Sequence, residues 1–375
     1  MDLQQKNINK NFASHENKNN SFGIIMVEKI KLAQGAGGEL MDQLIKNKIL
    51  KYLAKETSAE VSLSMLDDAA VIEDIVFTTD SHTIQPIIFP GGDIGSLSVS
   101  GTVNDISVMG AKPIALSAGF IIEEGLPMET FEKIVKSMSK CAIDASVPII
   151  TGDTKVVEKG AVQEFMINTS GVGKRTSTLD KNIEIVKQYR VFKKRWLLDS
   201  NLEKDDKIII SGNIGEHGVA LLSFREGYGY ETKIKSDVAP INSLMEKALF
   251  IGGIVSAKDP TRGGLANTVN EFSQKSKIGV ILDEDCIPIP DGVQSACNML
   301  GIDPLEIGNE GKFVIGVVQE KAEEVLAAIK KHPLGKNAAI IGEATDRVKG
   351  VVLKTVVGGK RNLHKPIGDP VPRIC

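Results

Sequence analysis

The segment from Ile94 to Met109 constrains the fold most, because it has the length of a helix and consists mostly of small and β-branched residues. Such a helix must pack closely against other elements, and Gly110 is well placed to end it. The pair Asn104-Asp105 lies inside this segment. A carboxylate in a tightly packed helix is unfavourable unless a cation or hydrogen-bond donors lie nearby. The segment therefore predicts a buried helix beside a polar site.

The chain is long enough for two hydrophobic cores. It has 375 residues, of which 42% are hydrophobic, and single cores stop growing near roughly 250–300 residues. Strand-length and helix-length apolar segments alternate through 62–172 and again through 207–357. This alternation predicts an α/β fold, or α+β layers, in two domains.

Shifts in composition predict where the parts of the chain begin and end. The first residues are mostly Asn, Lys and Gln and cannot repay the entropy of ordering. Charged and apolar residues are mixed after residue 174, where the strand–helix alternation stops, and their charge is typical of a solvated face or of a helix that docks a partner. The predicted parts are a disordered extension at 1–25, an N-terminal domain at 26–173, a linker with a surface insertion at 174–204, a C-terminal domain at 205–357 and a mobile tail at 358–375.

Charge and cysteine usage exclude several classes of protein. The formal net charge is −3, and Lys and Arg are dispersed, which argues against binding to nucleic acid or to a membrane surface. The four cysteines, Cys141, Cys286, Cys297 and Cys375, form no CxxC pair, which argues against a zinc site and a disulfide framework. No apolar run approaches the roughly 18 residues of a spanning helix. We therefore expect a cytoplasmic protein whose ligand is a small molecule or another protein.

A glycine-rich loop, Gln34 to Glu39, lies between a predicted strand at 22–32 and a helix whose apolar residues recur four apart from Leu40. Bare N–H groups and the positive end of the helix dipole would make such a loop an anion site, to which Gly35, Gly37 and Gly38 would contribute. The alternative is a simple turn, which glycines also form.

Four aspartates stand at strand ends or in the small-residue helix: Asp68, Asp80, Asp105 and Asp153. Each could be a turn or capping residue when taken singly. Together, beside a glycine loop, they suggest a magnesium–nucleotide site, because magnesium prefers oxygen ligands and bridges phosphates with few carboxylates. Asp153 belongs to the stretch from Thr151 to Lys155, in which an acid and a base leave a short predicted strand together.

The second half contains two further polar turns. The stretch from Asp259 to Gly264 precedes a helix and is a second candidate phosphate cradle, in which Arg262 could hold oxygen atoms bidentately. A turn from Gly308 to Lys312 carries Glu310 before a strand.

The last seven residues hold two prolines and end on Cys375. Proline fixes φ and removes a backbone donor, so this stretch should be extended, and an extended arm could carry a thiol into a cleft. The alternative is a frayed terminus with an incidental cysteine.

These segments, in this order, resemble the hydrogenase expression/formation protein HypE family of carbamoyl dehydratases, which belongs to the superfamily of aminoimidazole ribonucleotide synthetase and selenophosphate synthetase. The resemblance covers about residue 27 to 375. It rests on Gly35-Ala36-Gly37-Gly38, Asp67-Asp68-Ala69-Ala70-Val71, Phe89-Pro90-Gly91-Gly92-Asp93, Gly101-Thr102-Val103-Asn104-Asp105, Thr151-Gly152-Asp153-Thr154-Lys155, Asp259-Pro260-Thr261-Arg262-Gly263-Gly264, Asn309-Glu310-Gly311-Lys312 and Pro372-Arg373-Ile374-Cys375.

The resemblance implies an N-terminal sheet domain that forms a homodimer and binds ATP with Mg²⁺, and a C-terminal α/β domain that closes the cleft. It also implies the reaction. The carbamoyltransferase HypF would load a carbamoyl group onto the Cys375 sulfur, and ATP would drive its dehydration to an S-cyanide. The cyanide would then pass to the HypC–HypD scaffold complex for nickel–iron hydrogenase maturation.

The resemblance and the chemistry together assign roles to individual residues. Cys375 would carry the substrate, Lys155 and Arg262 would be cations for the transferring phosphoryl group, and Glu310 or His217 would deprotonate the nitrogen. Glu310 could equally be a turn carboxylate. The expected ligands of ATP and magnesium are Gly35, Gly37, Gly38, Asp68, Asp80, Asn104, Asp105, Asp153 and Thr154, with the four aspartates binding the metal.

Three features depart from the family: Gln34 stands where histidine is common, the segment 174–200 is long, and the first 25 residues are extra. Selenophosphate synthetase is disfavoured because it places a reactive Cys or selenocysteine in the N-terminal glycine loop, and residues 1–38 contain no cysteine. Aminoimidazole ribonucleotide synthetase has no use for a C-terminal cysteine such as Cys375. A non-catalytic thiol carrier would leave the aspartates unexplained.

Overall fold

The computed structural model describes residues 29–55, 58–225, 233–368, 370–371 and 373–375. The chain divides into a first unit, Met1–Lys31, of which only residues 29–31 are described, and a second unit, Leu32–Cys375, which holds every element named below. Within the described ranges, no helix has the length and apolar character that crossing a bilayer requires.

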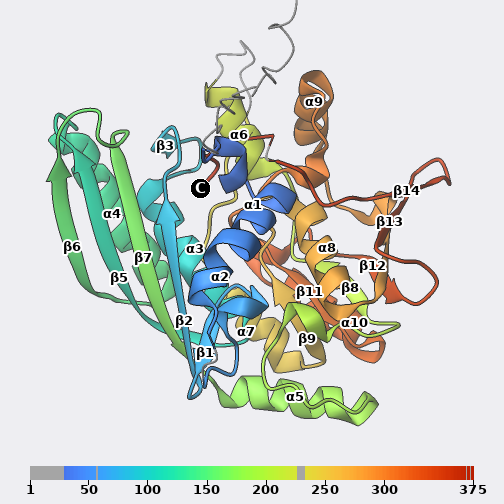
Figure 1. The fold of residues 1–375 in the computed structure, drawn as a ribbon. Helices are drawn as coiled ribbons and strands as arrows, with labels where there is room; N and C mark the ends of the chain where they lie inside the picture. The colour runs from blue at the N-terminus through green and yellow to red at the C-terminus, as the bar shows by residue number, and fades with distance from the viewer. Residues whose placement is uncertain (1–28, 56–57, 226–232, 369, 372) are drawn as a thin grey trace, which may run out of the picture. The chain divides into compact units, whose positions relative to one another are not determined.

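A five-stranded, mostly antiparallel sheet forms the first half of the second unit (Figure 1). Only β5 and β6 pair in parallel, and β6 is an edge strand. The strand order is β1 (Ala70–Ile72), β2 (Ile75–His82), β7 (Phe165–Lys174), β5 (Lys112–Glu123) and β6 (Ile149–Val157).

Helix α3 (Ile94–Val108) packs on one face of this sheet together with α4 (Met128–Ala145). Asp93 and Ser96 form a capping box at the start of α3, and Gly110, with φ +81°, follows its end. Gly171 of β7 permits the close approach, because a methyl group added there would lie 2.6 Å from Cδ1 of Ile106. The predicted buried helix is therefore confirmed.

A seven-stranded sheet forms the second half, with one parallel pair, β10 and β13. Its order is β14 (Lys360–Asn362), β13 (Val351–Lys354), β10 (Gly279–Asp283), β12 (Ala339–Thr345), β8 (Lys207–Ile210), β11 (Val314–Val317) and β9 (Ile254–Lys258). Its helices are α6 (Glu216–Arg225), α7 (Asn242–Ile251), α8 (Gly264–Ser276), α9 (Asp291–Leu300) and α10 (Ala322–Lys330). Two sheets with their own helices confirm the predicted two-domain α/β fold.

Shorter elements connect these layers. A small hairpin comprises β3 (Ile88–Phe89) and β4 (Gly92–Asp93). Near the start of the unit lie η1 (Leu32–Gly35), α1 (Gly38–Leu44), η2 (Ile45–Ile49), α2 (Leu50–Leu53) and η3 (Leu63–Met65). Farther along lie α5 (Ser177–Tyr189), η4 (Asp199–Asn201), η5 (Glu284–Cys286), η6 (Pro304–Glu306), η7 (Gln319–Lys321) and η8 (Pro333–Gly335).

The segment 174–204 differs most from its prediction as a surface insertion. It contains α5, whose Leu179, Ile183 and Val186 recur at helical spacing and are buried. Trp196 is only 2% exposed and belongs to a core that also contains Ile106 of the first sheet domain and strand β8 of the second. The segment is therefore part of the core that the two halves share.

Three other predictions need correction or fall outside the description. The extension predicted at 1–25 lies outside the described residues, and so do residues 22–28 of the strand predicted at 22–32. Residues 29–31 are described and form no strand, and a helical turn, η1, begins at Leu32. Strand β6 begins at Ile149 and runs through Lys155, so Thr151 to Lys155 lie within a strand instead of following one. The segment predicted as a tail contributes β14 to the second sheet, because its backbone pairs with β13.

Candidate active site between the two sheet domains

Two of the predicted aspartates come together where β2 packs against α3. Alternate residues of β2 point toward α3, so Thr78 is buried and Asp80 is half-buried there. The Thr78 hydroxyl donates to Asp105 Oδ2 at 2.8 Å, and the Thr102 hydroxyl donates to Asp80 Oδ2 at 3.1 Å. Residues 102 and 105 share a helix face because they are three apart. The alternation of side chains along β2 and the helical spacing in α3 therefore place Asp80 and Asp105 at one acidic site.

Asp68, which precedes β1, is held by a lysine that no sequence pattern indicated. Lys258, at the end of β9, donates to Asp68 and lies 3.4 Å from Asp199 Oδ2 and 3.3 Å from Glu271 Oε2. Burial is the largest influence on the pKa of Lys258 and lowers it, but the three carboxylates raise this pKa well above the usual value overall. Lys258 therefore stays charged and holds Asp68 in place.

The turn after β9 adds one predicted cation and one carboxylate that was not predicted. Asp259 is 5% exposed, and its charge acts on the pKa of both Asp105 and Glu310. Arg262 follows in the same turn. Glu310 is 2% exposed, and its Oε1 has no hydrogen-bond partner among the described residues. Asp259 directly follows β9, and a position at the end of a strand is what had drawn attention to other aspartates of the chain.

The acidic site favours protonated carboxyls in the absence of added cations. Burial raises the pKa of Asp105 and Glu310 well above the usual carboxyl range, and neighbouring carboxylates raise both pKa values further. Burial also raises the pKa of Asp259 to about 7. A cation that entered would relieve this repulsion.

The donor set fits magnesium in its chemistry. Among the described residues, no three His, Cys, Asp or Glu side chains converge closely enough to hold one metal ion by themselves. Magnesium usually takes only one or two protein carboxylates and fills its other positions with water and phosphate oxygens. Asp80 and Asp105 offer such carboxylates, and the unpartnered Glu310 oxygen lies in the same charge cluster.

The tail brings the thiol to this site. A pocket of about 400 Å³ is lined by Cys375, Arg262 and Gly35, together with Ser81 and Thr83 at the end of β2. The charge of Cys375 is the largest cause that raises the pKa of Arg262. The predicted thiol, glycine loop and arginine therefore line one cavity.

Other residues of the glycine loop fit closely against their neighbours. A methyl group added at Gly37 would lie 2.8 Å from Cβ of Arg262, and one added at Gly38 would lie 2.0 Å from the Pro366 carbonyl oxygen. Both glycines have positive φ.

Asn104 positions backbone in this structure. Its amide nitrogen donates to the carbonyl oxygens of Glu310 and Ala239, each at 3.2 Å, and its oxygen accepts from the Ile241 N–H at 2.9 Å. The side chain is 1% exposed. Asn104 thereby joins α3 to the turn that carries Glu310.

His217 is occupied by the tail. Its Nε2 lies 2.8 Å from the Ile374 carbonyl oxygen, and its Nδ1 lies 2.7 Å from the Ser236 hydroxyl. Burial lowers its pKa, which favours the neutral ring. With both ring nitrogens engaged, His217 holds the tail in this structure and has no lone pair available for a substrate proton.

Asp153, Thr154 and Lys155 are not brought to the acidic site within one chain. Asp153 and Lys155 form an ion pair at 2.8 Å, and their side chains are 70% and 67% exposed. Asp153 lies on β6, which is three strands from Asp80 on β2 and therefore about 14 Å away at the usual strand spacing.

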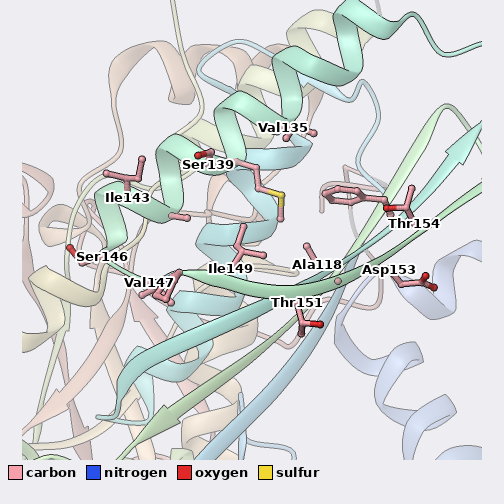
Figure 2. A pocket seen from close by; sticks show the side chains of 15 residues that line it. Ala118, Val135, Ser139, Ile143, Ser146, Val147, Ile149, Thr151, Asp153 and Thr154 are labelled. Atoms are coloured by element: carbon pink, nitrogen blue, oxygen red, sulfur yellow. The ribbon is translucent and has the colours of Figure 1, made fainter.

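A larger hollow is separate from the acidic site. An apolar groove of about 810 Å³ runs between α4 and strands β5 and β6, where Val135, Ile143 and Ile149 line it (Figure 2). Asp153 also borders this groove, but its carboxylate points away from α4 (Figure 2). Cavity size alone would have favoured this groove over the acidic site, so the acidic site is identified by the chemistry of its side chains.

Comparisons with known proteins agree with this arrangement. The family model described as AIR synthase related protein, N-terminal domain, matches residues 66–174, and the model of the C-terminal domain matches residues 203–354. A hydrogenase expression/formation protein of Methanocaldococcus jannaschii is 52% identical over 92% of this chain and all of its own length. Carbamoyl dehydratase HypE of Escherichia coli strain K12 is 42% identical over 93% of this chain and all of its own length.

Solved structures show the same similarity. The HypE of a HypE–HypF complex is 43% identical, with a TM-score of 0.78 over 86% of this chain and 99% of the other. A hydrogenase maturation protein HypE in complex with ATP is 38% identical, with a TM-score of 0.73 over 92% of this chain and all of the other.

Proposed function

Because this chain belongs to the HypE family of carbamoyl dehydratases, we propose that it uses ATP to dehydrate an S-carboxamide on Cys375 to an S-cyanide for nickel–iron hydrogenase maturation. The observation that carries this proposal is the pocket in which Cys375, Arg262 and the glycine loop meet. A thiol at the end of a chain has no evident reason to be held beside an arginine and a buried acidic cluster unless it takes part in the chemistry there.

In the proposed dehydration, the oxygen atom of the carbamoyl amide leaves as part of inorganic phosphate. The amide oxygen of the carbamoyl group takes the γ-phosphoryl group of ATP, and ADP leaves. The C–O bond then breaks with phosphate as the leaving group, two protons leave the nitrogen, and the C≡N bond forms. Phosphoryl transfer of this kind depends mainly on positioning and charge neutralisation.

The residues of the site divide this work. Arg262 would stabilise charge on the transferring oxygens next to the Cys375 sulfur. Once a bound cation has relieved the repulsion from its neighbours, Glu310 would be ionised and would accept nitrogen protons. Bound magnesium would neutralise the phosphate oxygens, and Asp68, Asp80 and Asp105 would hold it. Lys258 keeps Asp68 in position.

The open face of the first sheet supports a homodimer. Phe77 on β2 and Ile121 on β5 are 48% and 38% exposed on the face opposite α3. Asp153 and Lys155 project from the same face, because they pair with β5 in register with Gly119 and Ile121. A second copy packed on this face would cover the apolar side chains and could receive Asp153 and Lys155 at its own nucleotide site, whereas Thr154 pairs with Phe120 and lies on the α4 face.

The partners follow from the reaction. A HypF-type carbamoyltransferase would load Cys375, as the solved HypE–HypF complex of a relative suggests, and a HypC–HypD-type scaffold would accept the cyanide. We place these steps in the cytoplasm, where thiols stay reduced. None of the four cysteines is in a disulfide in the structure's described residues.

Mass spectrometry of the C-terminal peptide tests this function. After incubation with the carbamoyl donor system, we expect a carbamoyl adduct on Cys375 that loses the mass of one water only with ATP and magnesium. Cys375→Ala should abolish product yet bind ATP with unchanged affinity. An adduct on Cys286, which is exposed, or an adduct that never loses water, would contradict the proposal.

The same samples distinguish the proposed enzyme from a thiol carrier that has no catalytic activity. A carrier would accept the carbamoyl group but show no magnesium-dependent ATP hydrolysis. The buried carboxylates with raised pKa values favour the enzyme, since a carrier has no need for them.

A further inference from the structure

We propose that a socket formed by Gly218, Gly308 and His217 recognises Ile374, the residue before the reactive cysteine, and thereby sets the position of the Cys375 sulfur. Ile374 is 1% exposed, although it lies next to a half-exposed residue at the end of the chain. Ile367, in the same tail, is 72% exposed. Val371 is buried as well, so burial is confined to particular residues of the tail, and Ile374 is the buried one next to the thiol.

Two glycines leave the space that the Ile374 side chain fills. A methyl group added at Gly308 would lie 2.9 Å from Cδ1 of Ile374 and 2.7 Å from the Thr261 carbonyl oxygen. A methyl group added at Gly218 would lie 2.3 Å from Cγ2 of Ile307 and 3.4 Å from Cδ1 of Ile374. Side chains at either position would close the socket.

The socket opens into an apolar cluster. Ile374 and Val371 belong to the same buried cluster as Ile84, which follows β2, and Leu221 of α6. Filling such a site with a branched aliphatic side chain is favourable, and truncating that side chain to alanine leaves a cavity.

His217 recognises the backbone of the same residue. A carbonyl oxygen can only accept, so Nε2 of His217 carries the hydrogen that is donated to Ile374 at 2.8 Å. In the neutral ring Nδ1 then accepts from the Ser236 hydroxyl at 2.7 Å. The Ser236 hydroxyl can donate to Nδ1 and so stabilises the tautomer that the Ile374 carbonyl requires, which makes His217 a positioning residue.

The residues on either side of Ile374 add polar contacts, one of which joins the Arg373 guanidinium to the Gln163 side chain. The N–H of Thr83 donates to the Cys375 carbonyl oxygen at 3.2 Å, and the Arg373 guanidinium donates to the Thr83 carbonyl oxygen at 2.7 and 3.0 Å. The Cys375 side chain stays half-exposed, in the pocket with Arg262. Residue 373 thus adds polar contacts to the tail, residue 374 fills the socket, and residue 375 presents the thiol.

The catalytic consequence rests on the proposed function, whereas the socket can be tested without any chemistry. Carboxypeptidase removal of Cys375 from the chain, followed by intact mass, reports how often the tail leaves its socket, because cleavage follows the population of the open form when opening is fast. Each rate is divided by the rate on a free peptide with the same end, which removes the preference of the protease itself.

The matched pair is Ile374→Ala and Ile367→Ala. We expect Ile374→Ala to reduce the protection of Cys375 from carboxypeptidase by about tenfold or more, which corresponds to about 1.4 kcal/mol of docking free energy. Ile367→Ala should leave this protection unchanged. Equal protection in the two variants would overturn the socket. Normal protection in a wild-type chain that forms no S-cyanide would instead overturn the proposed function and leave the socket intact.

A second set of variants leaves the tail sequence unchanged. His217→Gln keeps a side-chain N–H donor and should retain most of the protection, whereas His217→Leu should lose it. His364→Gln, at an exposed histidine of the tail, is the control. Equal protection in His217→Leu and His217→Gln, with both folded by circular dichroism, would contradict the role of His217.

Discussion

Gly38 shows how one residue decides where the glycine loop meets the tail. Its φ is +72°, and a methyl group added there would lie 2.0 Å from the Pro366 carbonyl oxygen. That oxygen accepts the N–H of Glu39 at 2.9 Å, so helix α1 begins directly against the chain that leads to Cys375. Only glycine tolerates both the backbone conformation and the contact.

Gly38→Ala is predicted to destabilise the protein by about 2 kcal/mol or more, because the clash is with backbone and cannot be relieved by a rotamer change. Gly35→Ala is the matched control, since its added methyl group would meet nothing within 4 Å and its φ is not positive. Urea unfolding of both variants measures the difference. Two equal midpoints would show that α1 does not depend on this contact.

At the scale of elements, buried ion pairs join helix α1 and the start of the tail to the acidic site. Lys365 contacts Asp42 of α1 at 2.9 Å and Glu271 of α8 at 3.0 Å. Glu271 in turn contacts Lys258 of β9, which holds Asp68. Removing one partner of such a chain leaves an uncompensated buried charge. The elements around the site are therefore coupled by charge.

Glu271→Gln tests this coupling through the pH dependence of stability. Although burial alone would raise it, Lys258, Lys365 and Lys275 lower the pKa of Glu271 to about 2. Because this folded-state pKa lies below the unfolded value of about 4.5, the contribution of Glu271 is present at neutral pH and is lost as pH falls from about 4.5 toward 2.

The variant should accordingly be less stable than the wild type at pH 7, and the difference should shrink on acidification through pH 4. Chemical unfolding at pH 7, 5 and 4 measures it. Glu246→Gln, at an exposed position of α7, is the control. A difference that does not change with pH would mean that packing, and not charge, makes Glu271 matter.

At the scale of the whole molecule, one chain accounts for only part of the expected nucleotide site. The exposed Asp153 and Lys155 lie three strands from Asp80, on an open sheet face with exposed apolar side chains. A second copy on that face is the arrangement in which these residues would serve a site.

Phe77→Glu should convert the proposed homodimer to a monomer, because it places a charge on the face that the second copy would cover. Ile143→Glu, on α4 and lining the groove of Figure 2, should remain dimeric. Light scattering coupled to gel filtration measures the mass. Loss of the dimer only in Ile143→Glu would move the interface to the groove.

Local pattern was enough to predict much of this fold. The helix predicted from Ile94 to Met109 is α3, and Asp105 within it has the polar partner that was expected, the Thr78 hydroxyl. The segment 174–204 was misjudged because its many charges obscured the apolar face of α5. Periodicity reports which face of an element is buried, but not which other element buries it.

The sequence by itself determined which residue types were available: carboxylates near glycine turns, an arginine before a helix, and a thiol on a proline-stiffened end. Only the tertiary structure decided their partners. Lys258 meets Asp68 across 190 positions of sequence, His217 holds the Ile374 carbonyl, and Asp153 is carried away on an edge strand. Helix and strand periodicity act over a few residues, whereas ion pairs and the socket at Ile374 depend on chain segments that meet only when both sheets have folded.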